Sequence, residues 1–228
     1  MRRSLRWMRP VLMGGGGKTP WYLSGGVPLV NCVAAYQPIG AADLASSYIN
    51  LANPGTYDAA PGTAPSFAAA TGWTFNGTDQ YLNSGVVPSL NPNSWSALVR
   101  FSDYGASVRW LFGIKQSESP WGSFAIKCST SAHTCIYAKA DAESPQAPEI
   151  LSGVLGMNAT KGFRNGVYDR DLIVSTVANA NPIYIGAACK LDNTPIYFLN
   201  GKIQALAIYS IGITDAQMTA ISIAMAAL

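Results

Sequence analysis

Carboxylates are the first residues to test for chemistry, because cleavage of a glycosidic bond needs two of them at a fixed separation. The chain has only three glutamates (Glu118, Glu143 and Glu149), and none lies on an expected strand with a second carboxylate on the same face. Asp169 and Asp171 are two residues apart, but they follow an expected Asn-Gly turn, which favours an exposed loop pair. The sequence therefore predicts no catalytic residues and a protein that is not an enzyme.

The cysteine thiols and the single imidazole give little further indication of catalysis or metal binding. His133 is the only histidine, and Cys128 and Cys135 border its polar loop, but no third group stands near enough in sequence to orient a Cys–His pair. These two cysteines, with Cys32 and Cys189, form no C-x-x-C units, so no metal site of the zinc type is expected. Cys128 and Cys135 would face each other across a hairpin, either as buried thiols or as a disulfide.

Residues in expected loops favour binding over catalysis. We expect no cofactor, with calcium as the open alternative, because that ion needs several converging oxygen ligands. The aspartates near expected loops are Asp79, Asp103, Asp169, Asp171 and Asp192. Aromatic side chains near strand ends suit stacking on sugar rings, although Trp121 would equally pack back onto a strand edge. The candidate ligand-binding residues are Tyr104, Trp121, His133, Tyr137 and Tyr168.

Net charge is concentrated at the N-terminus. The chain of 228 residues has 15 Lys and Arg against 12 Asp and Glu, and five of the basic residues fall in the first twenty positions. Residues 1–26 are therefore expected to form a basic, glycine-hinged arm that meets an acidic protein surface, with nucleic acid a less favoured partner, or that stays solvated. The candidate assembly residues of this arm are Arg2, Arg3, Arg6, Arg9, Lys18, Trp21 and Tyr22. The pair Trp21-Tyr22 would dock onto its own domain or onto a neighbouring subunit.

Two further patterns bound the class of protein. The apolar stretch after the basic residues, Pro10 to Met13, is shorter than the roughly 7–15 residues of a signal-peptide core. No segment approaches the roughly 18–20 apolar residues of a membrane span. We therefore expect no export signal and no membrane insertion, and a single domain at 27–228.

Apolar residues in the body alternate with period 2, which is typical of half-buried strands. Trp95, Ala97, Val99 and Phe101 share one face of such a run, and Trp110, Phe112 and Ile114 share one face of the next. Many short strands with turn signals at regular intervals indicate a sandwich or barrel. The strand at 203–209 is apolar on both faces, with Ile203, Ala205, Ala207 and Tyr209 on one and Leu206 and Ile208 on the other.

A helix to cover that strand is expected directly after it. Thr214 and Gln217 fit a capping box, and Met218, Ile221 and Met225 follow at helical spacing. The sequence predicts an amphipathic helix at about 214–227 that packs on the sandwich.

A series of short motifs resembles the laminin G-like jelly rolls of the concanavalin A-like lectin–glucanase family. The resemblance implies an all-β, two-sheet antiparallel jelly-roll sandwich with one C-terminal helix and an extended N-terminal arm. Glycosidases of that family carry an E-x-D-x-x-E strand, which this sequence lacks. In chain order the motifs are Phe75–Leu82, Trp95–Phe101, Gly162–Gly166, Ile185-Gly186, Phe198–Ile203, Ala207–Ser210 and Ile213–Gln217.

The segment Trp21–Gly26 ahead of the jelly roll also resembles structural proteins of tailed bacteriophages. This resemblance implies a non-enzymatic virion decoration, fibre or tail-associated protein, located in the virion after assembly in the host cytoplasm. Its partners would be other virion proteins, further copies of itself and a cell-surface glycan. The alternatives are a free carbohydrate-binding lectin module and, less favoured, a glycoside hydrolase.

Overall fold

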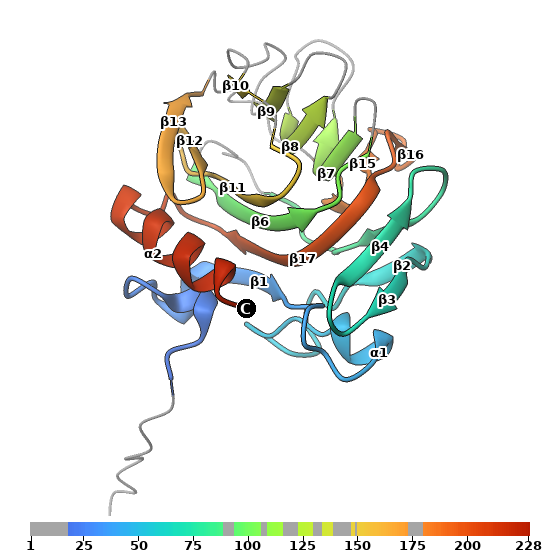
Figure 1. Ribbon diagram of the computed structural model, residues 1–228, viewed down its shortest axis with the longest axis horizontal. Helices are drawn as coiled ribbons and strands as arrows, with labels where there is room; N and C mark the ends of the chain where they lie inside the picture. Colours follow the sequence, from blue (N-terminus) through green and yellow to red (C-terminus); the bar gives the residue numbers. More distant parts are fainter. Residues whose placement is uncertain are drawn as a thin grey trace, which may run out of the picture.

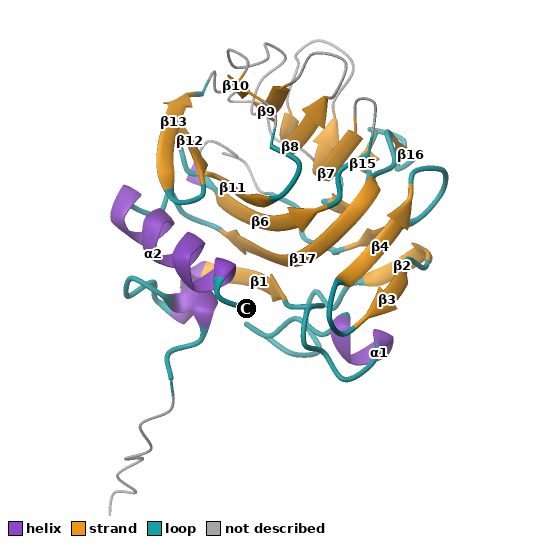
Figure 2. Ribbon diagram, in the orientation of Figure 1, coloured by secondary structure: helices purple, strands orange, loops and turns teal. Residues whose placement is uncertain are grey.

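The chain folds as a two-sheet, largely antiparallel β-sandwich with one C-terminal helix, as the sequence predicts (Figures 1 and 2). The computed structural model describes residues 18–88, 94–105, 109–115, 123–129, 134–138, 147–148, 150–172 and 180–228.

The first sheet, sheet A, has the strand order β13-β12-β11-β6-β17-β4-β3, and β1 pairs with the far half of β17. Its long central strand β17 lies between β6 on one edge and β4 and β1 on the other. The strands of sheet A are β1 (Cys32–Tyr36), β3 (Ser66–Ala68), β4 (Gly72–Asn76), β6 (Ser96–Ser102), β11 (Gly153–Met157), β12 (Lys161–Arg164), β13 (Val167–Asp171) and β17 (Asn200–Tyr209).

The second sheet, sheet B, has the strand order β10-β9-β8-β7-β14-β5-β2. A short hairpin of β15 and β16 joins it through β15, which pairs parallel with β7. The strands of sheet B are β2 (Ala60–Thr63), β5 (Tyr81–Asn83), β7 (Arg109–Lys115), β8 (Ser123–Ser129), β9 (Thr134–Ala138), β10 (Ala147–Pro148), β14 (Tyr184–Ile185), β15 (Ala188–Cys189) and β16 (Pro195–Ile196).

The core lies between the two sheets. Trp95, Ala97, Val99 and Phe101 all face it, which confirms the alternation expected for this run. The opposite face of β6 presents Leu98 to a second apolar layer, between sheet A and the C-terminal helix.

Two β-bulges correct the faces expected for other strands. In β17 the register shifts between Ile203 and Ala205, so Ile203 joins Leu206 in the central core while Ala205 faces the helix layer. In β7 it shifts between Trp110 and Phe112, so Phe112 points inward and Trp110 points outward. A bulge inserts one residue and reverses the alternation beyond it, which a strict period of 2 does not anticipate.

Helix α2 (Asp215–Ala226) covers the outer face of sheet A, where the sequence predicts it. Its capping box is present: the Thr214 side chain accepts from the Gln217 backbone N–H, and the Gln217 side chain accepts from the Thr214 backbone N–H. Met218, Ile221 and Met225 are fully buried against the sheet. The helices of the described chain are α2, the short α1 (Leu44–Ser47) and the 3-10 turns η1 (Trp21–Leu23) and η2 (Leu29–Asn31).

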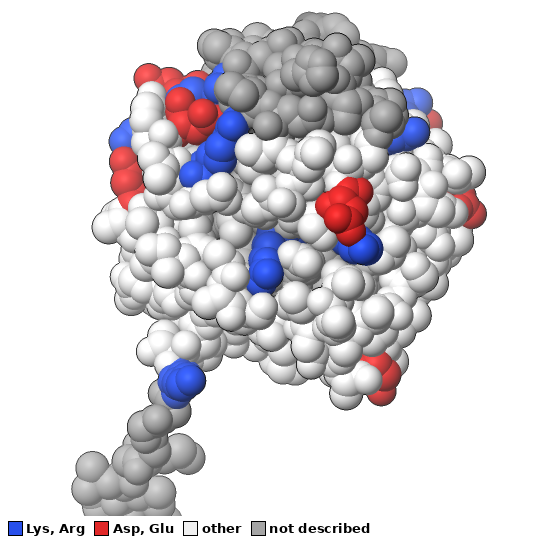
Figure 3. Space-filling model, in the orientation of Figure 1, with Lys and Arg blue, Asp and Glu red and all other residues white. Residues whose placement is uncertain are grey.

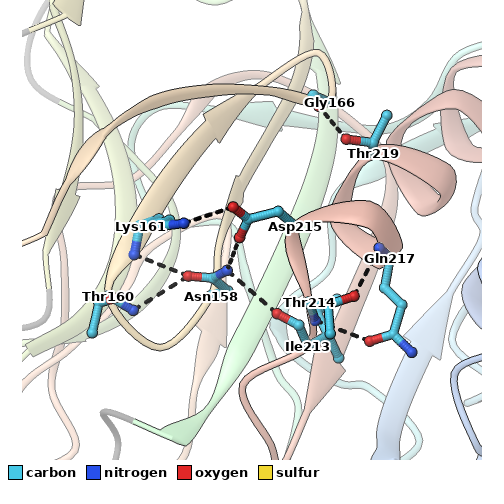
Figure 4. Close-up of polar contacts among 9 residues, drawn as sticks. All are labelled: Asn158, Thr160, Lys161, Gly166, Ile213, Thr214, Asp215, Gln217 and Thr219. Atoms are coloured by element: carbon cyan, nitrogen blue, oxygen red, sulfur yellow. Dashed lines mark hydrogen bonds and ion pairs between the residues drawn. The ribbon is translucent and has the colours of Figure 1, made fainter.

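Polar contacts fix α2 at both ends. At its start, Asn158 Nδ2 donates to the Asp215 carboxylate at 3.1 Å, and Lys161 Nζ pairs with the same carboxylate at 2.6 Å (Figure 4). Along its length, Thr219 Oγ1 donates to the Gly166 carbonyl at 2.6 Å. At its end, Arg100 Nη1 donates to the carbonyl of Met225 at 3.0 Å, where a cation also complements the helix dipole.

The residues nearest the N-terminus that the structure describes belong to the same packed layer. Trp21 Nε1 donates to Gln37 Oε1 at 2.8 Å, and the Tyr209 hydroxyl donates to the Tyr22 carbonyl at 2.8 Å. Trp21 and Tyr22 are buried, so of the two surfaces left open by the sequence they dock onto their own domain. Lys18 is exposed, and Arg2, Arg3, Arg6 and Arg9 lie outside the described residues.

Candidate functional site

The outer face of sheet B carries a small aromatic and cationic cluster, which we call the Tyr197 platform. It consists of Trp110 and Lys115 on β7, Lys127 on β8, and Tyr197 at the end of the β15–β16 hairpin. The bulge in β7 is what turns Trp110 outward to this face.

Tyr197 lies over Trp110 with the two rings nearly parallel, 9° apart, and their centroids separated by 6.1 Å. Trp110 is buried beneath the hairpin with Ala125 and Ala188, whereas Tyr197 remains 40% exposed. Stacked aromatic pairs stabilise one another by roughly 0.5–1.5 kcal/mol beyond their burial, so Trp110 holds the tyrosine ring in one orientation.

The backbone at Tyr197 adopts φ +55°, in the left-handed region that bulky residues rarely occupy. Such strain costs of the order of 1–3 kcal/mol, and it persists only where surrounding contacts enforce it. One of these contacts is the Trp110 N–H, which donates to the Tyr197 carbonyl at 3.2 Å. The strained conformation aims an aromatic side chain outward from an otherwise ordinary turn.

The loop before Tyr197 is fixed by hydrogen bonds from the buried side-chain amide of Asn181. Asn181 Nδ2 donates to the carbonyls of Lys190 and Leu191 and to Asn193 Oδ1, at 2.9–3.1 Å. The Tyr184 hydroxyl donates to the Asn193 carbonyl at 2.9 Å. These contacts make the hairpin a preorganised support, which reduces the entropy lost when a ligand binds.

Two ammonium groups border the aromatic pair. Lys115 Nζ lies 4.9 Å from the centre of the Tyr197 ring and donates to its hydroxyl at 3.2 Å. Lys127 Nζ lies 5.8 Å from the centre of the Trp110 ring. Within the described residues no carboxylate pairs with Lys115. The platform therefore joins an exposed π-face to positive charge.

Beneath the platform, Gly113 and Ala125 lie opposite each other on β7 and β8, and both are buried. A Cβ at Gly113 would lie 2.3 Å from the Ala125 Cβ, so only glycine fits there.

Of the residues that the sequence nominated for ligand binding, Tyr104 occupies a different environment from the one expected. It is 5% exposed, packs edge-on against Phe101, and its hydroxyl accepts from the Arg109 N–H and donates to the Cys128 carbonyl. A tyrosine that joins the two sheets in this way presents no ring face to a ligand.

Tyr168 is 51% exposed on the edge strand β13, and its role in ligand binding stays a prediction. Its ring meets Phe163 edge-on at 6.4 Å, and Lys161 Nζ lies 5.8 Å from its centre. The positions of Trp121 and His133 lie outside the described residues. Tyr137 lies in β9, where its backbone pairs with Ile126, and its side chain is also outside them.

Three of the five nominated carboxylates, those of Asp103, Asp169 and Asp192, form ion pairs. Asp169 and Asp171 lie on β13 rather than in a loop, and Asp169 pairs with Arg170 at 3.2 Å and with Arg164 at 3.7 Å. Asp103 pairs with Lys202, and Asp192 with Lys190. In the described part of the chain, no three Asp, Glu, His or Cys side chains gather as metal ligands would.

Cys128 and Cys135 face each other in register across β8 and β9, as expected for a hairpin. Cys32 and Cys189 are buried free thiols, and Cys128 is buried as well. Burial raises the pKa of Cys32 to about 12 and that of Cys189 to about 11, which makes both poor nucleophiles near neutral pH.

Among the described helices, none has the length and apolar character that a membrane span requires.

No protein-family model matches this chain, and no curated protein matches it. Several solved structures match its fold. A mutant of Trypanosoma rangeli sialidase that displays trans-sialidase activity superposes with a TM-score of 0.57 at 16% identity, over 87% of this chain and 34% of that chain. The Trypanosoma rangeli sialidase in complex with sialic acid gives 0.57 at 12% identity, over 86% of this chain and 33% of that one. A mutant NanB sialidase from Streptococcus pneumoniae gives 0.49 over 66% of this chain.

These matches correct two predictions. The Trypanosoma rangeli neighbours are sialidases, which are glycoside hydrolases, so the expectations of a virion structural protein and of a protein that is not an enzyme are contradicted. The phage and laminin G-like resemblances gain no support. At such identities the likeness shows the fold alone, and this chain spans about one third of the length of the Trypanosoma rangeli sialidases.

Proposed function

We propose that this chain is a lectin-like, carbohydrate-binding domain that serves glycoside hydrolysis, and that it binds an acidic sugar on the Tyr197 platform. Its fold corresponds to one third of the Trypanosoma rangeli sialidase, a protein whose structure is known in complex with sialic acid. A domain that covers part of a larger sialidase chain suits substrate capture.

The observation that carries the proposal is the exposed Tyr197 ring with an ammonium group beside it. Sugar rings stack their C–H faces on aromatic side chains, and a rigid ring loses little entropy when it binds. The Lys115 ammonium lies 4.9 Å from that ring and favours a sugar that bears a carboxylate. Sialic acid combines a pyranose ring with such a carboxylate.

The β13 edge offers the only rival tyrosine–lysine pair among the described residues, and it fits less well. There Lys161 is already paired with Asp215 at 2.6 Å, and this pairing raises the pKa of the lysine. The Lys161 ammonium group is therefore already engaged in an ion pair that fixes the start of α2. For Lys115, by contrast, the hydrogen bond and the cation–π contact with described side chains are both made to Tyr197.

Calorimetric titration of the whole chain with sialyllactose, and with lactose as the neutral sugar, tests the proposal. We expect binding of sialyllactose only. Tyr197→Ala should weaken it at least about tenfold, a loss of about 1.4 kcal/mol. Lys115→Gln should weaken it by roughly threefold to tenfold and flatten its dependence on salt, because a partly exposed ion pair is screened.

Tyr168→Ala is the matched control, since it removes another exposed tyrosine that lies beside a lysine. It should leave the affinity unchanged. Equal binding of lactose would refute the acidic sugar, and loss of binding in the Tyr168 variant instead would move the site to β13. Absence of binding to either sugar would refute the proposal as a whole.

A further inference from the structure

A second group of aromatic side chains lies beside the Tyr197 platform, on the same outer face of sheet B. The centre of the Tyr81 ring lies 4.7 Å from that of Tyr184 and 6.4 Å from that of Phe198. Tyr81 on β5 and Tyr184 on β14 point outward, because the next residue on each strand points into the central core. Phe198 directly follows Tyr197 in the chain, so the aromatic surface continues from β7 toward β5.

The strand register places Tyr81 beside Trp110. Ile185 on β14 pairs with Leu82 on β5 and with Phe112 on β7, so these residues form one row across three strands. Tyr81 comes just before this row on β5, and Trp110 comes just before it on β7, across the bulge. Neighbouring strands are about 4.8 Å apart, so β5 and β7 are separated by roughly 10 Å, which is on the scale of two linked sugar rings.

Backbone hydrogen bonds fix the segment that carries Tyr197 and Phe198. Before it, the Trp110 N–H donates to the Tyr197 carbonyl at 3.2 Å. After it, the Leu199 N–H donates to the Gly186 carbonyl at 2.8 Å, and Leu199 is fully buried in the central core. The two neighbouring rings are therefore preorganised, which reduces the entropy lost when a ligand binds.

Tyr184 has a structural role in this group, whereas the Tyr81 hydroxyl is without one. Tyr184 is 4% exposed, and its hydroxyl donates to the Asn193 carbonyl at 2.9 Å. Tyr81 is half-buried, and its hydroxyl has no hydrogen-bond partner within the described residues. A Cβ at Gly62 would lie 2.0 Å from Tyr81 Cζ, so glycine leaves room for this ring across β2. The hydroxyl can thus exchange hydrogen bonds with a ligand.

A neutral amide lies on the same face as Tyr81. Asn83 is two residues further along β5, so its side chain shares the outward direction. Its Oδ1 accepts from the Gly85 N–H at 2.8 Å, and its Nδ2 has no acceptor within the described part of the chain. We call Tyr81, Asn83 and Phe198 the Tyr81 patch. Aromatic rings with a few uncharged hydrogen-bonding groups suit a neutral sugar.

Affinity on this protein must come mainly from such local contacts. Only 12% of the residues are charged, and on the face shown in Figure 3 the charged side chains are few and scattered. Long-range attraction of an anionic ligand is therefore weak. Contact with more than one sugar ring is then the direct way to a stronger and more selective complex.

We propose that the Tyr81 patch binds the neutral sugar that follows an acidic sugar in a glycan chain. The inference rests on the function proposed for the Tyr197 platform, which binds the acidic sugar, and it adds the class of ligand: an acidic sugar linked to a neutral one. The two subsites differ in charge, because Lys115 Nζ lies 4.9 Å from the Tyr197 ring whereas the Tyr81 patch is uncharged. A neutral sugar alone contacts only the patch, so lactose stays below detection.

Calorimetric titration of the whole chain with free sialic acid and with sialyllactose separates the two subsites. Sialyllactose should bind the wild type about tenfold more tightly, because only this ligand reaches the Tyr81 patch. Tyr81→Ala should remove the difference and leave the affinity for sialic acid unchanged. Tyr81→Phe keeps the ring and its packing, so it should lose roughly threefold with sialyllactose alone, from one hydrogen bond.

Tyr168→Ala, on β13 of sheet A, is again the control and should change neither affinity. Equal affinities of the wild type for the two sugars would overturn the second subsite and leave the platform in place. An equal loss for both sugars in the Tyr81 variants would also overturn it, since the side chain would then act through the fold or through the platform. Binding of neither sugar would refute the platform and this inference with it.

Discussion

The outer faces of the two sheets are built differently. Sheet A is covered by α2 and η1, and its outer layer is a large cluster that includes Leu98, Tyr209 and Ile221. Among the described residues, the outer face of sheet B carries a small cluster around Trp110 under a two-stranded hairpin. Sheet A is thus packed on both faces, whereas the described cover on the outer face of sheet B is much smaller.

The polar contacts follow the same division. On sheet A, Lys161 lies beside an exposed tyrosine but forms an ion pair with Asp215 at the start of α2. On sheet B the corresponding Lys115 touches tyrosine and no described carboxylate. The comparison teaches that an aromatic–lysine pair is informative about binding only when the lysine has no structural task.

The largest expected effect is a difference in stability between substitutions in α2, which covers sheet A, and in the β15–β16 hairpin, which covers part of sheet B. Ile221→Ala in α2 should lower the free energy of unfolding by about 2–5 kcal/mol, because it opens a cavity in a fully packed layer. Ile196→Ala, under the partly open cover of sheet B, should cost clearly less. Chemical denaturation of both variants measures the difference.

Ile223→Ala controls for helix propensity, since Ile223 lies two residues further along α2 but is exposed. Its change should stay within about 0.5 kcal/mol. If Ile196 proved as costly as Ile221, the hairpin would be as integral to the fold as the helix, and the division between the two faces would fail.

Local patterns predict much of this fold. The capping box of Thr214 and Gln217 and the spacing of Met218 and Ile221 identify α2 to within about a residue at each end, because caps and amphipathic faces are short-range properties. Alternation likewise assigns the faces of β6. The turn at Asn165-Gly166 has positive φ at both residues, as that dipeptide favours.

The candidate site was not predicted, for a physical reason. Trp110 reaches the outer face only through the bulge in β7, and Tyr197 is aimed outward by a strained backbone. Both depend on tertiary contacts rather than on local pattern. The adjacent apolar pair Leu111 and Phe112, both in the central core, is the one signal that breaks the period of 2.

Alkaline pH provides a second, intermediate test. Burial raises the pKa of Cys32, in the helix layer of sheet A, from 9.0 to about 12, and that of Cys189, beside β7 in sheet B, to about 11. The unfolded chain therefore loses these protons first, and stability is fully present below pH 9 and falls above it. Each thiol contributes a slope approaching about 1.4 kcal/mol per pH unit.

Unfolding curves between pH 8 and 9.5, where most tyrosines of the unfolded chain are still protonated, follow the start of this decline. Cys32→Ala and Cys189→Ala should each flatten the decline. A variant whose decline matches the wild type would show that its thiol is less buried than the packing implies.

The smallest expected effect on stability is also the sharpest test of the open face. Tyr197→Asn should change the free energy of unfolding by no more than about 0.5 kcal/mol, because asparagine tolerates positive φ and relieves strain while the stack on Trp110 is lost. Denaturation measures the first quantity, and calorimetric titration with sialyllactose should show that binding has disappeared.

Tyr197→Phe separates the ring from its hydroxyl. It keeps the stack and the strain but removes the hydrogen bond from Lys115, so it should retain most of the affinity. A protein that gives up no stability when Tyr197 is replaced, yet loses its ligand, holds that side chain for binding. If Tyr197→Asn instead cost more than about 2 kcal/mol, the tyrosine would be a structural lid over Trp110. Sheet B would then be closed in the way that sheet A is.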